Sequence, residues 1–345
     1  MSRQSTGQLL VHQAGPGLTV QDLGRPGWLA QGLARGGAAD RLALAEAEAL
    51  LGAPGAALEM AAGGGVFSVD RPARIALTGA PMAANADGQR LVWNACHMLA
   101  PGVCLTLQPL GVGVYSYLSV GGGLATPTVM GARATHLIAG LGGPIAAGDT
   151  LALGDDPGGP VAQVLPDPAR FGGGELRFVH GFQSHLFDPE VRATFETTQF
   201  LRDARGNRQG VALIAGATRF AAKSGLTILS EPILPGDIQM TGDGVPYVLL
   251  AECQTTGGYP RIGTVIPPDL PIVAQAAPGT ALRFRRISVE EAVTEMQREA
   301  TSRAALARQL RPLVRDPSVA DLLSHNLISG VWPTAQDGQE DGLPG

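Results

Sequence analysis

Apolar and polar residues alternate in several short runs along the chain. In a β-strand successive side chains point to opposite faces, so a period of two predicts strands with one buried face. Pro-Gly pairs between the runs are typical of turns in which glycine adopts a positive φ. The clearest strand candidates are residues 73–77, 103–107, 176–178 and 282–284, and the Pro-Gly pairs lie at 101–102, 235–236 and 278–279.

Helix signals are few. They predict helices from Asp40 to about Leu51, from Asp188 to about Phe200, and from Ser288 to a point before Pro312. Asp40 and Ser288 are residue types that favour N-caps, and Ser288 has a glutamate three residues later, which forms a capping box. Short helices among many strands and turns indicate a mainly β protein.

The composition agrees with a folded, turn-rich β protein. Of 345 residues, 45% are hydrophobic and 16% charged, with 48 glycines and 26 prolines. A large core can therefore be buried, and global disorder is not expected. The pattern predicts one domain over residues 1–168 and a second over 173–290, with 166–175 as the linker. A C-terminal helix and a partly disordered tail are expected within 291–345.

Charge and cysteine content exclude several classes of protein. The net charge is −5 and the only lysine is Lys223, so no basic stripe for nucleic acid is evident. No apolar run is long enough for a membrane helix, and the N-terminal residues lack the pattern of a signal peptide. Three cysteines are too few and too irregular for a disulfide framework. We therefore expect a cytoplasmic protein without membrane or nucleic-acid partners.

One run in the second half has the composition of a ligand site. The segment "AECQTTGGYPRIGTV" follows a predicted buried strand and contains an amide, two hydroxyls, a phenol and a guanidinium. Its two glycines allow the backbone to approach a ligand closely, and an arginine fork can hold a carboxylate. The candidate residues are Glu252, Gln254, Thr255, Thr256, Tyr259 and Arg261.

Other polar, glycine-bearing runs supply further candidates. "TVQDLGRPG" contains Asp22 and Arg25, which lie either at a pocket or in a buried pair that holds the fold together. Asp40, in "ARGGAAD", is interpreted either as an N-cap or as a functional acid. The run "MGARATH" adds Arg133, and "GNRQG" adds Asn207 and Arg208.

Several common site motifs are absent from the sequence. There is no Walker A run and no Gly-x-Ser-x-Gly elbow, so neither a P-loop nor a serine hydrolase is supported. His180 and His185 have no further ligand nearby in sequence, which favours a structural or surface role. The sequence predicts no metal site.

Taken in order, these runs resemble one family. "TVQDLGRPG", "GAAD", "TGAPM", "SVGGGL", "GARAT", "NRQG", "SEP" and "QTTGGYPRIGTV" occur as they do in the C-type component of bacterial 5-oxoprolinase. That family is also described as biotin-dependent carboxyltransferase or allophanate hydrolase subunit 2. The resemblance implies two cyclophilin-like β-barrel domains. The family commonly has Asp-Arg where this chain has Glu252-Cys253, so one cation is missing here.

The resemblance also implies an activity and partners. With A-type and B-type subunits and ATP (with Mg), such a chain would be part of a lactam hydrolase that opens 5-oxo-L-proline to L-glutamate, active only in the complex. Arg261 or Arg208 would hold the substrate carboxylate, with Arg25, Arg133, Asn207, Gln254, Thr255, Thr256 and Tyr259 as further binding residues. Asp22, Asp40 or Glu252 would move the proton.

Two other functions remain open from the sequence. One is a carboxyltransferase subunit that acts on a urea-type substrate with biotin carried on another protein. The other is a regulatory protein that sequesters a B-subunit-like inhibitor of a histidine kinase. Urea, biotin and 5-oxoproline all present a planar amide or ureido group, so an amide-rich pocket would suit each.

Overall fold

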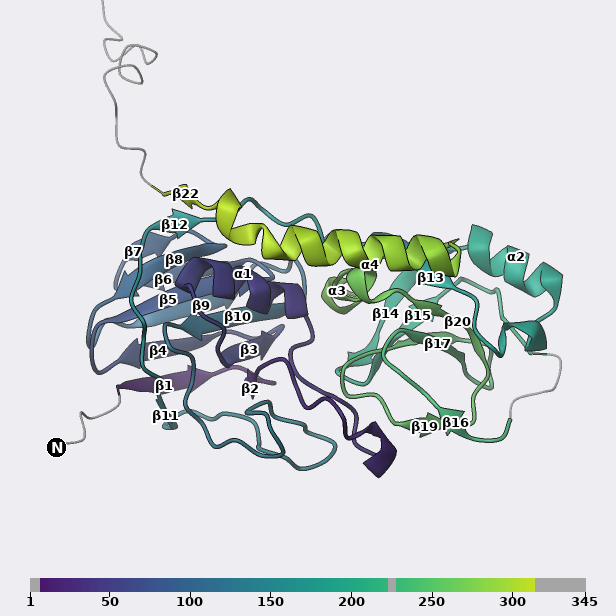
Figure 1. Ribbon diagram of the computed structural model, residues 1–345, viewed down its shortest axis with the longest axis horizontal. Helices are drawn as coiled ribbons and strands as arrows, with labels where there is room; N and C mark the ends of the chain where they lie inside the picture. Colours follow the sequence, from purple (N-terminus) through teal and green to yellow (C-terminus); the bar gives the residue numbers. More distant parts are fainter. Residues whose placement is uncertain (1–6, 223–227, 314–345) are drawn as a thin grey trace, which may run out of the picture. The chain divides into compact units, whose positions relative to one another are not determined.

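The strands before residue 165, joined by one short strand at residues 311–312, form two antiparallel sheets, here called the sandwich (Figure 1). The computed structural model describes residues 7–222 and 228–313. One sheet has the order β11-β1-β4-β9-β6-β7, from Thr150–Ala152, Gln8–Ala14, Gly65–Val69, Leu105–Pro109, Met82–Ala86 and Gln89–Leu91. The other has the order β2-β3-β10-β5-β8-β12-β22, from Thr19–Gln21, Ala57–Ala61, Tyr115–Val120, Ala73–Gly79, Ala95–Leu99, Gln163–Val164 and Arg311–Pro312.

The sandwich core lies between these sheets. Leu9 and Phe67 come from one sheet, and Leu58, Ile75 and Leu118 come from the other; all are fully buried in one apolar cluster. The alternation predicted at 73–77 is therefore a real strand. The strand predicted at 103–107 begins two residues later, at Leu105, because the chain is still leaving the turn at Pro101 and Gly102.

The second half contains a closed barrel, here called the barrel. Its order is β13-β20-β17-β18-β15-β14-β21, from Gly174–Val179, Arg261–Val265, Asp237–Met240, Pro246–Leu249, Gly210–Ile214, Gln199–Asn207 and Ala281–Arg286. A separate pair joins β16 (Glu231–Pro232) to β19 (Thr256–Gly257). Phe178, Phe200 and Phe284 fill the barrel, where Phe178 and Phe200 each pack edge-on against Phe284. Phe178 also packs edge-on against Phe195, which comes from the helix outside. Because aromatic rings occupy the interior, a ligand site must lie outside the barrel or at its rim.

The helices are close to those predicted. Helix α1 covers Arg41–Leu51, with Asp40 as its N-cap and Gly52 as a left-handed C-cap. Helix α4 covers Val289–Ala304 and begins with the predicted capping box. Helix α2 spans Pro189–Thr197 and ends earlier than predicted, because Phe200 belongs to β14 and its ring enters the core. The shorter helices are α3 (Leu270–Gln275), η1 (Leu29–Gln31), η2 (Ser184–Leu186), η3 (Pro267–Asp269) and η4 (Leu306–Gln309).

The expected linker is anchored by one buried arginine. Residues 165–173 do connect the sandwich to the barrel. Arg170, however, is only 7% exposed, and its guanidinium binds Asp40 at 2.6 Å and both oxygens of Glu46 at 2.7 Å. Gln275 of α3 donates a further hydrogen bond to Asp40 at 2.8 Å. The segment therefore fixes the sandwich to the barrel instead of separating them.

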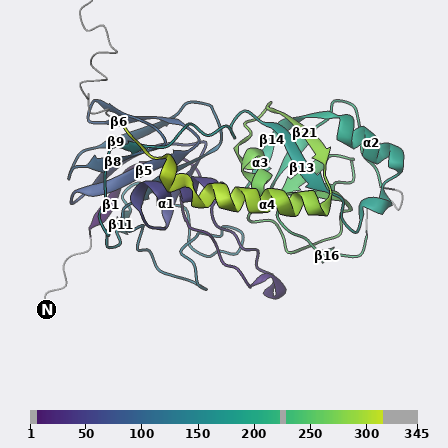
Figure 2. The same cartoon turned by 45° about the horizontal axis from the view of Figure 1, so that its top comes forward.

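Helix α4 also bridges the two parts. Figures 1 and 2 both show it beside α1 and β13, and contacts join it to both elements. After α4 the chain returns to the sandwich, where β22 pairs with β12. Within the described ranges no helix combines the length and hydropathy needed to cross a bilayer. The tail expected to be disordered lies outside the described residues.

Candidate functional site

A cluster of buried charges joins the sandwich to the barrel, and we call it the junction cluster. It consists of Glu59, Tyr117 and His136 from the sandwich and Arg208 and Glu252 from the barrel. Arg208 donates from Nε to Glu252 at 2.5 Å, from Nη1 to Glu59, and from Nη2 to the carbonyl of Gly37 at 2.5 Å. Although burial would lower the pKa of Arg208, the two carboxylates raise it above its usual value. The guanidinium therefore stays charged and fully paired.

The remaining carboxylate oxygens of the cluster are also occupied. Glu59 accepts from the Tyr117 hydroxyl at 2.6 Å and from the backbone of Ala39 at 2.8 Å. Glu252 accepts from the backbone of Leu137 at 3.1 Å, with Nδ1 of His136 at 3.9 Å. Arg208 and Glu252, which we expected to hold a carboxylate and to move a proton, are thus engaged with each other and closed off from solvent.

Asp22 and Arg25 have different environments. Asp22 accepts hydrogen bonds from the backbone of Gly24 at 2.8 Å and of Arg133 at 2.6 Å, and it lines a pocket of the sandwich. Arg25 is 2% exposed and donates to the carbonyls of Val129 at 2.9 Å and Ala134 at 2.5 Å. Its burial lowers its pKa, against the opposing effect of Asp22 and Glu252. The two side chains do not pair with each other; both hold the loop around residues 129–134.

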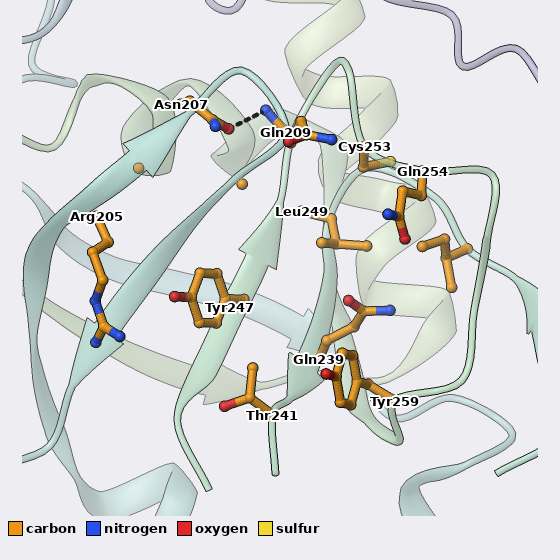
Figure 3. A pocket seen from close by; sticks show the side chains of 13 residues that line it. Arg205, Asn207, Gln209, Gln239, Thr241, Tyr247, Leu249, Cys253, Gln254 and Tyr259 are labelled. Carbon is orange, nitrogen blue, oxygen red and sulfur yellow. Dashed lines mark hydrogen bonds between the residues drawn. The ribbon is translucent and has the colours of Figure 1, made fainter. Parts of the chain in front are cut away.

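The pocket that combines most predicted residues lies on the outer face of the barrel, and we call it the barrel pocket (Figure 3). Ile238 and Val248 point into the barrel core, so their neighbours Gln239, Tyr247 and Leu249 point outward. The register places Gln239 opposite Tyr247. The cavity volume is about 380 Å³, and its lining residues are Arg205, Gly206, Asn207, Gln209, Gly210, Ile233, Gln239, Thr241, Tyr247, Leu249, Cys253, Gln254 and Tyr259.

The barrel pocket has an apolar floor and a rim of amides and phenols. Ile233, Leu249 and Cys253 form one small apolar cluster. The amides come from Asn207, Gln209, Gln239 and Gln254, and the phenols from Tyr247 and Tyr259. Neutral donors and acceptors around an apolar floor suit a flat, polar ring that presents amide groups.

Gln239 is the most informative residue of this pocket. It is 8% exposed, and its Nε2 has no hydrogen-bond partner among the described residues. A buried donor without an acceptor costs about 1–3 kcal/mol, so an ordered water or a ligand is expected to supply the acceptor. Gly257 packs so closely that a Cβ there would lie 2.8 Å from this nitrogen, which gives a physical reason for one glycine of "QTTGGY".

Arg205 is the charged side chain at the rim. Its guanidinium pairs with Asp203, with Nη2 2.6 Å and Nε 3.1 Å from Oδ2, and 58% of its side chain is exposed. An exposed pair of this kind is weak, so the fork can turn to an incoming carboxylate at little cost.

Several predicted residues lie outside the barrel pocket. Arg261, expected to hold a carboxylate, already binds Glu231 at 2.8 Å and Asp237 at 3.0 Å. Thr255 and Thr256 were expected beside Gln254, but neither side chain lines the pocket. Thr256 belongs to β19. In an extended strand successive side chains point to opposite sides, so Gln254, Thr255 and Thr256 do not share one face as a cluster. Of the predicted set, the barrel pocket contains Asn207, Gln254 and Tyr259.

Six further side chains line the pocket but were not predicted from the sequence: Arg205, Gln209, Gln239, Thr241, Tyr247 and Cys253. A signal for Gln239 was present, since a polar residue lies between Ile238 and Met240 in the run "DIQM". Alternation identifies such a residue as outward-facing. It cannot reveal that the loop 251–260 folds over that face and buries it.

Cys253 provides a test of whether the pocket contains a nucleophile. The thiol is 3% exposed, and burial followed by the charge of Asp237 raises its pKa to about 12. At pH 8 only about one thiol in 10,000 would then be ionised. We expect iodoacetamide to modify the partly exposed Cys104 well before Cys253 in the native protein. Peptide mass spectrometry over time would measure both rates, and faster modification of Cys253 would show an activated thiol.

The fold and the order of the motifs define a class. The chain belongs to the family of carboxyltransferase domains, subdomains A and B, whose family model matches residues 31–286. Among curated proteins, it is 34% identical to the C-type component of 5-oxoprolinase from Escherichia coli (strain K12) over 301 residues. That match covers 84% of this chain and 94% of the relative. The protein of the same name from Haemophilus influenzae is 30% identical, with 79% and 89% covered. The family resemblance seen in the sequence is therefore confirmed.

Solved structures agree with the fold. The structure of Kluyveromyces lactis urea carboxylase matches with a TM-score of 0.80 at 21% identity, over 97% of this chain and 32% of that one. The crystal structure of TTHA0988 matches with a TM-score of 0.75 at 30% identity, over 83% of this chain. This chain spans 57% of TTHA0988 and about a third of the urea carboxylase. The mainly β class expected from the sequence is thus confirmed.

Proposed function

We propose that this chain is the C-type component of an ATP-dependent 5-oxoprolinase and that its barrel pocket receives the lactam. The observation that carries the proposal is the buried, unpartnered amide of Gln239 in a pocket rimmed by neutral amides and phenols. Two relatives that carry the name of this 5-oxoprolinase component, and that match over most of their length, support the same function. A-type and B-type subunits are the proposed partners.

A planar five-membered lactam suits the lining of this pocket. Its ring carbons would lie on Ile233 and Leu249. The lactam oxygen would accept from Nε2 of Gln239 once the amide, whose nitrogen is buried beside Gly257, turns toward the cavity. The lactam N–H would donate to an amide oxygen of Gln254 on the facing loop. A donor aimed at the carbonyl oxygen stabilises the negative charge that develops there as water attacks.

The substrate carboxylate is assigned to Arg205. Arg208 and Arg261 have their guanidinium groups engaged by buried or partly buried carboxylates, whereas Arg205 has only an exposed partner. An arginine binds a carboxylate through two parallel hydrogen bonds, which would fix the ring orientation as well as add affinity. We assign Arg208 and Glu252 to holding the pocket loop against the sandwich.

ATP, with Mg, is the proposed co-substrate of the assembled complex, and its hydrolysis would provide the free energy for lactam opening. In the net reaction, water adds its hydroxyl to the lactam carbon and a proton to the nitrogen as the C–N bond breaks. The described residues of the barrel pocket include one cation, Arg205, so this pocket is suited to the lactam and not to a triphosphate.

The test is glutamate formation by the complex. We expect this chain, its neighbouring A-type and B-type subunits, ATP and 5-oxoproline to yield glutamate, and omission of this chain to abolish it. In the complex, Gln239→Met should lower kcat/KM by about 10- to 100-fold, because the shape is kept and one transition-state hydrogen bond is lost. Arg283→Gln is the matched control, since Arg283 is exposed on β21 and bonds Gln199 outside the pocket.

The outcome for Gln239→Met decides the assignment. Full activity in this variant, with the complex intact, would show that the lactam binds elsewhere. Loss of activity together with loss of assembly would instead be a structural effect, so assembly is measured in parallel by size-exclusion chromatography.

A second candidate is a carboxyltransferase subunit that uses biotin carried on another protein. The neutral rim favours any ureido or amide group, and urea amidolyase of Lachancea kluyveri is 27% identical over 82% of this chain. Arg205→Gln separates the two functions. Urea and biotin's ureido ring have no carboxylate next to the reacting amide, so Arg205→Gln should raise KM for 5-oxoproline and leave a urea reaction unchanged.

A further inference from the structure

A second pocket, in the sandwich, contains three arginines that the proposed reaction does not use. We call it the arginine pocket; its volume is about 470 Å³. Arg41 comes from the first turn of α1, Arg133 from the loop after β10, and Arg303 from the last turn of α4. Three separate segments thus each contribute an arginine to the lining of one cavity.

Two of these guanidinium groups have no partner in the described part of the chain. No hydrogen bond or ion pair from the side chain of Arg41 or Arg133 to another described residue exists. Arg303 forms a weak ion pair, in which Nη1 lies 3.6 Å from Oε1 of Glu299, one helical turn earlier. Arg170 and Arg208, by contrast, each bond two carboxylates. Unpaired cations that converge on a cavity indicate that an external anion completes the set.

The charges around the cavity favour an anion. Partial burial, and then the positive charges of Arg35 and Arg303, lower the pKa of Arg41 to about 10. Bringing an anion into the pocket would relieve this repulsion between cations.

Two carboxylates also line the pocket, and neither cancels the cations. Asp22 has its oxygens directed at the backbone N–H groups of Gly24 and Arg133, so it fixes the loop that carries Arg133. Glu48 lies on α1 seven residues after Arg41, which separates them by about 10 Å along the helix axis. Asp22 is thus occupied by backbone donors, and Glu48 lies about two helical turns beyond Arg41.

We infer that the arginine pocket binds a phosphate-bearing ligand. Planar guanidinium forks match the oxygens of a phosphate, and three of them suit a group with more than one phosphate. Gly131, at the pocket wall with a φ of +85°, has open space around the position of a Cβ, so the wall leaves room there. The ligand is either a nucleotide or a small inorganic phosphate, which share this chemistry.

The inference is tested by direct binding to the full chain. Pyrophosphate, ADP, ATP and adenosine are titrated by isothermal calorimetry at low salt, with succinate as a carboxylate comparison. Saturable binding of the phosphates, with a Kd that rises steeply with salt, is expected. Arg133→Gln and Arg41→Gln should each raise the Kd about tenfold or more, since neither side chain supports the fold. Arg298→Gln on the exposed side of α4 should leave the Kd unchanged.

One set of results distinguishes a nucleotide from inorganic phosphate, and another set would overturn the inference. Tighter binding of ADP or ATP than of pyrophosphate indicates a nucleotide, and equal binding indicates phosphate recognition alone. Absence of saturable phosphate binding at millimolar concentrations, equal affinity for succinate, or an unchanged Kd in both arginine variants would overturn it. Gln239→Met should bind phosphate like the wild type, so failure of the lactam assignment would not be confused with failure of this one.

Discussion

Replacing Arg208 with methionine is expected to lower the free energy of unfolding by about 3–5 kcal/mol, because two buried carboxylates lose their shared cation. Glu59 and Glu252 are each at most 2% exposed, and Arg208 is the cation that bonds both. The effect is large because the attraction between buried charges is lost while the cost of keeping the carboxylates out of water remains. Methionine retains most of the volume, so a cavity adds little to the loss.

Urea unfolding followed by circular dichroism would measure this change as a lower midpoint with an unaltered slope. Arg205→Met is the matched control: it removes an exposed arginine three residues earlier and should cost less than about 1 kcal/mol. The double variant Arg208→Met/Glu252→Gln should recover part of the loss, since one unpaired charge is then removed. A loss below about 1 kcal/mol for Arg208→Met alone would show that the junction cluster does not stabilise the fold.

The second large effect is expected at Asp40. Its Oδ1 caps α1 by accepting from the backbone of Leu42 and Ala43, and its Oδ2 binds Arg170 and Gln275. Asp40→Ala removes both functions and should cost about 3–5 kcal/mol. Asp40→Asn keeps an oxygen for the cap but removes the charge beside Arg170. It should therefore lower the free energy of unfolding by about 1 kcal/mol less than Asp40→Ala does.

The same pair of variants tests the catalytic interpretation of Asp40. If the residue moves a proton, Asp40→Asn would lose turnover in the complex well before it loses stability. If the residue is structural, as its full burial indicates, the folded fraction and the turnover of the variant should fall at the same temperature. Ser288→Ala is the control for a cap alone: it removes the exposed cap of α4 and should cost only about 1 kcal/mol.

The local parts of this fold were readable from the sequence. Asp40 and Gly52 mark the two ends of α1, and Ser288 with Glu291 marks the start of α4. Each cap bonds only residues within four positions in sequence. Alternation over 73–77 correctly identified a strand, but the prediction of one buried face was wrong, because α1 covers the second face and every residue of β5 is buried. The order of the motifs indicated the family, and the family model confirms it. Phe200 was misplaced in a helix because local propensity yielded to packing in the barrel core.

The candidate site was predicted less completely, for a physical reason. Polar, glycine-bearing runs can be recognised from adjacent residues alone. Such runs pointed to Asn207, Gln254 and Tyr259, which do line the barrel pocket. Which side chains meet depends on how the chain packs over long separations. Arg208 bonds Glu59, 149 residues away, and Arg170 bonds Asp40, 130 residues away, and no periodicity encodes such pairs.

The sequence by itself thus determined the mainly β class, the helix caps and the family. Each follows from interactions between near neighbours or from residue order. Tertiary structure decided which of the polar residues face a cavity and which are bound to one another. It turned Arg208 and Arg261 from ligand candidates into paired cations, and it placed Gln239 in the lining of a pocket with its Nε2 buried beside Gly257. Those outcomes depend on desolvation and partner geometry, which exist only once the sandwich and the barrel have packed.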